Sequence, residues 1–202
     1  MQTKDTYVLF RTPHSKHFTT LRQKNAPRTF LSLTDIPLTG GYVIAPFTTT
    51  DSCPIVFIEP DSIATNELVL PKLNVPHSTV STLNEETERS DYSRAFNTIK
   101  HLLNEASPKV EKVVLSRRLH CTSLNLTQAQ ELFAKACYYR PSSYVALWYT
   151  PQTGYWLVAT PEPLLEYAHH QWNTVALAGT LPFVEGVKPQ WNEKNCEEQA
   201  IV

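Results

Sequence analysis

Proline is the feature of this sequence that most limits how the chain can fold. Eight of the fifteen prolines lie within the first 76 residues, at positions 13, 27, 37, 46, 54, 60, 71 and 76. Proline lacks a backbone N–H donor and disrupts helix interiors, so it favours loops and sheet edges over long helices. The short runs between these prolines are rich in β-branched and aromatic residues, which predict strands at 7–10, 29–33, 41–47 and 55–58. We therefore predict a strand-rich segment over residues 1–75.

A polar stretch without periodicity follows this segment. Residues 76–90 combine Pro, Ser, Thr, Asn and Glu, a composition typical of a loop or linker. We place a domain boundary within it. Residues 1–86 form the strand-rich N-terminal portion with a linker at 76–86, and residues 87–202 form the second portion.

Two amphipathic helices are predicted in the second portion. The first would be capped by Ser90 or Asp91 and stopped by Pro108, and the second would be capped by Thr127. Each has apolar residues three and four positions apart, which places them on one helical face. These residues are Tyr92, Ala95, Phe96, Ile99, Leu102 and Leu103 in the first helix, and Ala129, Leu132, Phe133, Ala136 and Cys137 in the second.

Further strands and a terminal helix complete the predicted pattern. Apolar runs predict strands over 111–119, 164–167 and 174–177, and a hairpin of strands 144–149 and 154–159 around the turn 150–153. Asn192 can cap a helix that runs to Val202, where the sequence stops in mid-pattern. We expect from this that the domain is truncated, although a helix that frays at the end of the chain is the alternative.

The composition excludes several classes of function. Eighteen Lys and Arg balance nineteen Asp and Glu, which argues against a nucleic-acid binder. Only five glycines occur, and none form a phosphate-binding loop. The four cysteines are scattered without metal-site spacing, and we find neither a signal peptide nor an apolar run long enough for a membrane span. These features predict a cytoplasmic protein that binds neither membrane nor nucleic acid.

Two ionisable residues are candidates for acid–base chemistry. Lys112 opens a predicted apolar strand, and partial burial would lower its pKa toward that of a useful base. A lysine that points to solvent from a sheet edge is the alternative. Glu162 lies between Pro161 and Pro163, a rigid backbone that could direct the carboxylate into a cleft. A solvated carboxylate in a turn is the alternative.

Two further places could bind a ligand. Gly179 and Thr180 end a run of small residues where a ligand can approach the backbone closely. Glu197 and Glu198 could bind a hard cation through oxygen, but acidic residues near a helix start are also favoured by the helix dipole.

Four segments in this order resemble motifs of the chorismate-utilising enzymes, a family that includes isochorismate, salicylate, anthranilate and aminodeoxychorismate synthases. The segments are KVVLSR (112–117), LVATPEPLLE (157–166), ALAGT (176–180) and WNEKNCEEQAIV (191–202). The resemblance covers about residues 90–202. It implies an α+β fold of mostly antiparallel sheets with outer helices, here as part of the chorismate-binding, anthranilate synthase-like fold.

The resemblance also favours one branch of the family. Members that add water have a lysine at the start of the KVVLSR-like strand, as Lys112 is here, whereas anthranilate synthases generally lack it. Aminodeoxychorismate synthases place a lysine where this chain has Ala178. We therefore expect an isochorismate synthase feeding menaquinone or siderophore biosynthesis. A salicylate or anthranilate synthase-type enzyme and a non-catalytic half-domain are the alternatives.

The resemblance assigns roles to individual residues. Lys112 would be the base that activates water, and Glu162 the acid that protonates the leaving hydroxyl. Glu198 would help to hold Mg²⁺ against the ring carboxylate of chorismate. The remaining residues implied for the site are the substrate contacts Ala178, Gly179 and Thr180.

The chain also departs from the family pattern. Gln199 stands where many members have histidine, and Leu181 where arginine is frequent. The family's remaining substrate and Mg²⁺ ligands would lie beyond Val202, so we expect little or no turnover from these 202 residues alone. We also expect self-association, since an incomplete domain exposes core surface.

Overall fold

The computed structural model describes residues 5–69, 85–104, 112–117, 124–182 and 184–201. The chain divides into two compact units, which are described separately. The first unit joins Met1–Pro71 with Ala129–Val202, and the second comprises Lys72–Gln128. The first unit therefore contains residues from both sides of the boundary that we predicted after residue 86. That domain division stays a prediction.

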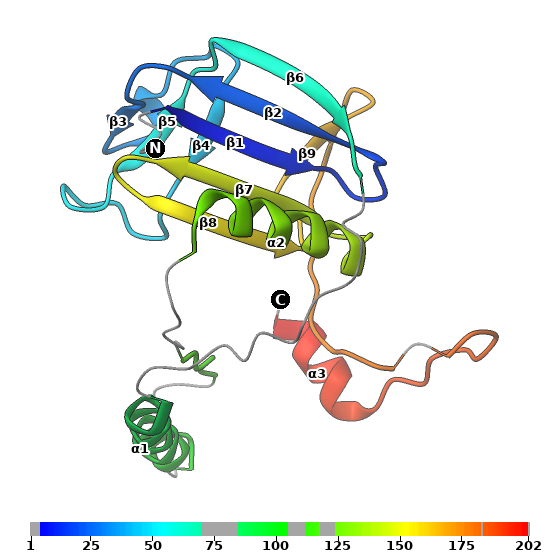
Figure 1. Ribbon diagram of the computed structural model, residues 1–202. Coiled ribbons are helices and arrows are strands. Elements are labelled where there is room, and N and C mark those ends of the chain that lie inside the picture. Colours follow the sequence, from blue (N-terminus) through cyan, green and yellow to red (C-terminus); the bar gives the residue numbers. More distant parts are fainter. Residues whose placement is uncertain (1–4, 70–84, 105–111, 118–123, 183, 202) are drawn as a thin grey trace. The chain divides into compact units, whose positions relative to one another are not determined.

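The centre of the first unit is a five-stranded antiparallel sheet (Figure 1). Its order is β6-β2-β1-β7-β8, in which β1 is central. The strands are β1 (Thr6–Arg11), β2 (His17–Gln23), β6 (Ser62–Glu67), β7 (Tyr144–Thr150) and β8 (Gly154–Thr160). Val8 lies opposite Leu21 on one side and Trp148 on the other, so β1 joins the N-terminal hairpin to the predicted hairpin β7–β8.

A second, smaller sheet packs against one face of the first. It has the order β3-β5-β4, with β3 (Arg28–Phe30), β4 (Tyr42–Ile44) and β5 (Ile55–Ile58), and a 3₁₀ turn (Leu33–Asp35) follows β3. All four residues of β5 are buried. The core between the two sheets consists of Val8, Leu21, Val56, Ile58, Ala146 and Trp148. Burial of these apolar surfaces is the main force that joins the sheets.

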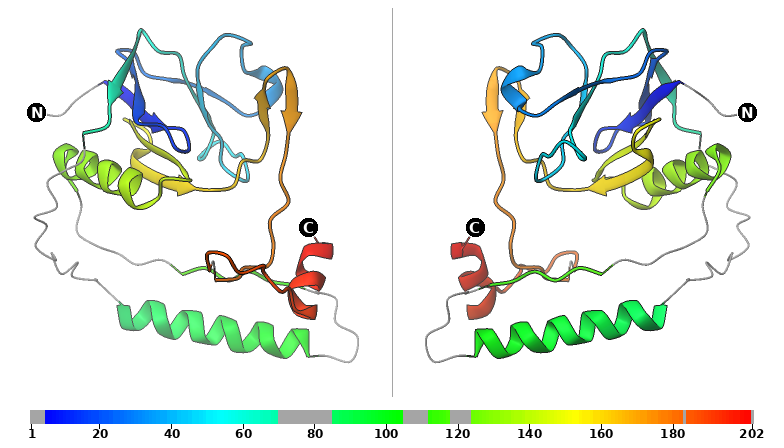
Figure 2. Two further views of the ribbon diagram at one scale, coloured as in Figure 1. Left: turned by 90° about the vertical axis from the view of Figure 1, so that its right-hand side faces the viewer. Right: turned by 90° about the vertical axis from the view of Figure 1, so that its left-hand side faces the viewer.

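Helix α2 (Leu126–Tyr139) covers the opposite face of the large sheet (Figure 2). Its residues Ala129, Phe133 and Cys137 are buried at a spacing of four, as the predicted stripe requires. Of the other two residues in the predicted stripe, Ala136 is half-buried and Leu132 is exposed, so the buried face is narrower than predicted. The Phe133 ring packs edge-on against that of Phe18, with centroids 5.6 Å apart.

The start and end of α2 are both held by hydrogen bonds. Asn125 caps the helix: its Oδ1 accepts from the Gln128 N–H, and its own N–H donates to Gln128 Oε1. The predicted cap at Thr127 is therefore wrong by two residues. Beyond the other end, the fully buried Arg11 donates to the carbonyls of Arg140 and Pro141, at 2.7 and 2.6 Å. These carbonyls lie just past the negative end of the helix dipole, where a guanidinium is favoured.

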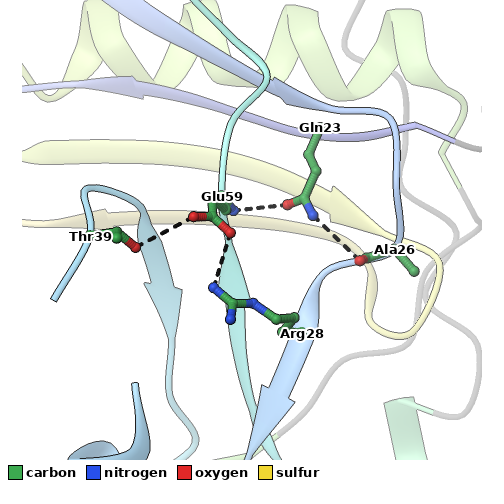
Figure 3. A network of polar contacts seen from close by, with 5 residues as sticks. All are labelled: Gln23, Ala26, Arg28, Thr39 and Glu59. Atoms are coloured by element: carbon green, nitrogen blue, oxygen red, sulfur yellow. Dashed lines mark hydrogen bonds and ion pairs between the residues drawn. The ribbon is translucent and has the colours of Figure 1, made fainter. Parts of the chain in front are cut away.

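A polar network links the ends of strands from the two sheets (Figure 3). The Glu59 N–H donates to Gln23 Oε1 at 2.9 Å, and the Glu59 carboxylate accepts from Arg28 at 3.0 Å and from Thr39 Oγ1 at 3.5 Å. The Gln23 amide in turn donates to the Ala26 carbonyl. Gln23 is buried, so its hydrogen bonds replace those it would make with water.

The second unit contains helix α1 (Glu85–Leu103), which includes the predicted apolar stripe. The helix begins within the stretch that we predicted as a loop, so neither Ser90 nor Asp91 caps it. Asp91 instead pairs with Arg94 along the helix surface. Residues 112–117 form no strand, which corrects that part of the strand predicted over 111–119, while residues 111, 118 and 119 lie outside the described residues. A strand needs a hydrogen-bonded neighbour, and none of the described strands pairs with these residues.

The α+β class is confirmed, with mixed helices and antiparallel sheets. Two predictions beyond β8 need correction. The strand predicted at 164–167 is the shorter β9 (Glu166–Ala168), and its partner is β10 (Gln171–Asn173). Residues 174–177, predicted as a strand, form none, because the β9–β10 ladder ends at the pair Asn173 and Glu166.

Candidate functional site

The candidate site is built around the contact between the ALAGT segment and helix α3 (Glu193–Ile201). The helix starts where the sequence predicted it, because Asn192 Oδ1 accepts a hydrogen bond from the Asn195 N–H at 2.9 Å. Near its other end, Gln199 Nε2 lies 3.4 Å from the Ala176 carbonyl oxygen and donates to it. These contacts involve one face of α3, since positions 192, 195 and 199 are three and four residues apart.

Gly179 allows the segment and the helix to approach closely. A Cβ atom at Gly179 would lie 2.9 Å from both Cβ and Nδ2 of Asn195, closer than real Cβ contacts. Asn195 is the one buried residue of α3, with 8% of its surface exposed. Glycine is therefore required here by packing against a buried side chain, and its backbone conformation is ordinary.

The predicted substrate contacts are only partly enclosed. Ala178 and Gly179 are half-buried, and Thr180 is exposed. Because Gly179 touches Asn195, these residues lie beside the helix that contains Glu198. The structure thus brings together two of the predicted groups, the proposed substrate contacts and the proposed metal-binding helix.

Glu198 is half-buried, and its carboxylate accepts from Lys194 Nζ at 3.2 Å. Among the described residues, no group of three or more His, Cys, Asp or Glu side chains is arranged to hold a metal ion. Mg²⁺ is commonly bound by one or two carboxylates together with water and substrate oxygens. The carboxylate chemistry of Glu198 and the neighbouring Glu197 fits that donor set.

The two predicted acid–base residues are exposed. The Glu162 N–H donates to Thr160 Oγ1 at 3.2 Å, which holds the turn after β8. Within the described part of the chain, Glu162 forms no hydrogen bond or ion pair with residues 178–180. Lys112 belongs to the other unit, and the partial burial expected for its ammonium group is not observed.

The two packed sheets, β6-β2-β1-β7-β8 and β3-β5-β4, are together called the β-sandwich. The clear pKa shifts among the described residues belong to groups of the β-sandwich and of α2. Burial raises the pKa of Tyr42, Tyr144 and Cys137. The Tyr144 hydroxyl donates to that of Tyr42 at 3.3 Å, a contact between the two sheets. These shifts therefore describe the core and assign no acid or base to the candidate site.

The family model described as "Chorismate binding enzyme" matches residues 59–198 of the chain. The chain belongs to the chorismate-binding enzyme family. The match includes all six of the site residues that the resemblance suggested. Neither the curated proteins nor the solved structures include one that matches this chain.

Family membership supports a chorismate-utilising enzymatic function and agrees with the α+β class. The branch of the family and the roles of the individual residues stay predictions. The described helices of this chorismate-binding enzyme include none with the length and apolar character that a membrane crossing requires.

Asn195 is the site residue that sequence reasoning missed. The sequence did contain a signal for it, because Asn192, Asn195 and Gln199 recur at helical spacing after a segment of small residues. Polar residues on one helical face ordinarily indicate exposure. Only the contact with Gly179 reveals that this face is the packed one.

Proposed function

We propose that this chorismate-binding enzyme is an isochorismate synthase. Support comes from Lys112 at the start of the KVVLSR segment and from Ala178, which stands where aminodeoxychorismate synthases have lysine. The observation that carries the proposal is the contact of Gly179 with Asn195, because it joins the proposed carboxylate-binding segment to the helix containing Glu198.

The proposed reaction exchanges one hydroxyl group for another. Lys112 accepts a proton from a water molecule, whose oxygen forms a bond to C2 of chorismate. The double bonds shift, the bond between C4 and its hydroxyl breaks, and Glu162 protonates the departing oxygen as water. One water molecule enters and one leaves, so atoms and charge balance. General acid–base catalysis of this kind contributes about 10²- to 10⁴-fold each to a rate.

The remaining proposed residues bind and orient the substrate. Gly179 permits close approach of the backbone to the ring carboxylate, and the exposed Thr180 hydroxyl can donate to it. Glu198, with Glu197 beside it, would hold Mg²⁺, which would neutralise part of the carboxylate charge when bound. The ion pair of Glu198 with Lys194 would open for this, an inexpensive change because surface ion pairs are weak.

The test of the function is product analysis with a lysine variant and its control. The gene product that contains these residues is incubated with chorismate and Mg²⁺, and the products are separated by chromatography. We expect isochorismate, and a loss of at least about 100-fold in kcat for Lys112→Ala. Lys100→Ala removes another exposed lysine of the same unit and should leave kcat unchanged.

Other products would assign another branch. Salicylate with pyruvate would identify a salicylate synthase, and anthranilate in the presence of ammonia an anthranilate synthase-type enzyme. Chorismate binding that depends on Mg²⁺ but yields no product would favour a non-catalytic half-domain. We further predict that the 202 residues alone show little or no turnover, a prediction that robust isochorismate formation by the purified chain would overturn. The cytoplasmic location and self-association remain predictions, which fractionation and light scattering respectively would check.

A further inference from the structure

A pocket in the β-sandwich contains none of the residues proposed to act on chorismate. It has a volume of about 460 Å³ and lies between the connection 45–54 and the hairpin β7–β8. Ile44, Val56 and Val158 supply its aliphatic walls. Volumes of 300–1,000 Å³ with mainly apolar linings are typical of small-molecule sites.

Two tryptophans give the pocket an aromatic wall. The indoles of Trp148 and Trp156 are neighbours across β7 and β8, with centroids 6.1 Å apart and planes only 3° from parallel. The Trp156 ring is fixed further, because its indole N–H donates to the Thr153 carbonyl at 3.0 Å. Rigid aromatic surfaces favour ligands that can stack on them or meet them edge-on.

The lining excludes charged ligands. It contains no Asp, Glu, Lys, Arg or His, and its polar members are Ser52, Cys53, Gln152 and Thr153. A dicarboxylate such as chorismate would lose its hydration here without gaining a cationic partner, which is strongly unfavourable. An amino acid zwitterion is disfavoured for the same reason. The four polar side chains suffice for one or two hydrogen bonds to a neutral molecule.

We propose that this pocket is a second ligand site, which takes a neutral planar aromatic molecule of roughly two fused rings with a hydroxyl or similar polar group. The proposal does not depend on the proposed function, because none of the residues proposed to act on chorismate line the pocket. Val158 is the one lining residue within a chorismate-family motif, the segment 157–166. The proposal also places this ligand between β4–β5, which precede the residues matched by the family model, and β7–β8, which lie within them.

The exposed Cys53 in the lining is a built-in reporter for occupancy. Peptide mass spectrometry measures the rate at which iodoacetamide alkylates Cys53, in the presence and in the absence of 2-naphthol, a neutral two-ring probe. Cys196, also exposed but absent from the lining, is the control in the same molecule. A probe of this size should bind with a dissociation constant on the order of 100 µM, so about 1 mM should slow alkylation of Cys53 roughly tenfold. The rate at Cys196 should not change.

Filling the pocket should remove this protection. Ala45 and Ser52 belong to the lining and are exposed, so Ala45→Trp and Ser52→Trp add bulk without replacing core residues. Each should reduce the protection of Cys53 to less than about twofold, measured as the ratio of rates within that variant. Thr48→Trp adds the same bulk at an exposed residue outside the lining and should keep the wild-type ratio.

Three results would overturn the proposal. The first is an unchanged Cys53 rate at about 1 mM probe, and the second is equal slowing at Cys53 and Cys196. The third is protection that persists at the wild-type level in both pocket-filling variants, since the probe would then bind elsewhere. None of these results would affect the assignment of isochorismate synthase activity.

Discussion

The β-sandwich and the candidate site differ sharply in how their residues are held. Apart from Asn195, the buried residues of the described chain lie in β1, β2, β5, β7 and α2 or directly before a strand, as Pro27 does before β3 and Ser143 before β7. The candidate site beyond β8 instead rests on one buried asparagine, one tight glycine and one long hydrogen bond. The comparison teaches that stability and the proposed chemistry are placed in different parts of the chain.

The N-terminal segment makes this division possible. It has no chorismate-family motif, yet its strand β1 pairs directly with β7. Its strand β5 buries the face of the large sheet that α2 does not cover. The family match begins at residue 59, so β1 to β5 precede it. The segment outside the match thus completes the core that supports β7 and β8.

The largest expected effect tests the contrast in packing through one substitution at two sites. Leu147 is 1% exposed in β7, whereas Leu164, near Glu162, is 91% exposed. Leu147→Ala should lower the free energy of unfolding by about 3 kcal/mol, since it removes buried methyl groups and leaves a cavity. Leu164→Ala should lower it by less than about 0.5 kcal/mol. Urea unfolding followed by tryptophan fluorescence measures both, and similar losses would contradict the contrast.

A smaller effect sharpens the description of the site. Gly179→Ala should destabilise the contact with α3 by about 2 kcal/mol through overpacking against Asn195. Hydrogen exchange should then show reduced amide protection in Glu193–Ile201, with the sandwich unchanged. Gly40→Ala is the matched control, because a Cβ at Gly40 meets nothing within 4 Å.

A double-mutant cycle tests the cause of this effect. Asn195→Gly removes the side chain that the new Cβ would meet, so Gly179→Ala should cost almost nothing in that background. A full additional cost there would show that the contact with Asn195 is not the reason for glycine.

The smallest effect is a pH dependence of stability that arises in helix α2. Burial raises the pKa of Cys137, so the folded state disfavours its thiolate. The stability contribution is complete below the ordinary thiol pKa of about 8.5 and falls as the pH rises toward the folded value. Cys137→Ala should flatten the loss of stability between about pH 8 and 9.5, below the range where tyrosines titrate. Cys53→Ala, at an exposed cysteine, should retain the wild-type slope, and a flattened slope there would contradict the assignment.

The sequence alone determined those features that depend on nearby residues. The predicted runs at 7–10 and 55–58, the hairpin β7–β8 and the stripe of α2 apart from the exposed Leu132 all appear, because alternation and helical spacing are local properties. The Asn192 cap of α3 is equally local, since it needs only the next three residues. The order of four motifs was sufficient for the family, which the match over residues 59–198 confirms.

Tertiary structure decided what depends on distant partners. Residues 112–117 and 174–177 have the composition of strands but form none, because a strand exists only beside a backbone that pairs with it. The position of β1 between β2 and β7 and the tryptophan-lined pocket likewise join residues far apart in sequence. The need for glycine at position 179 arises from Asn195, sixteen residues away, since steric exclusion acts between atoms that only the folded chain brings together.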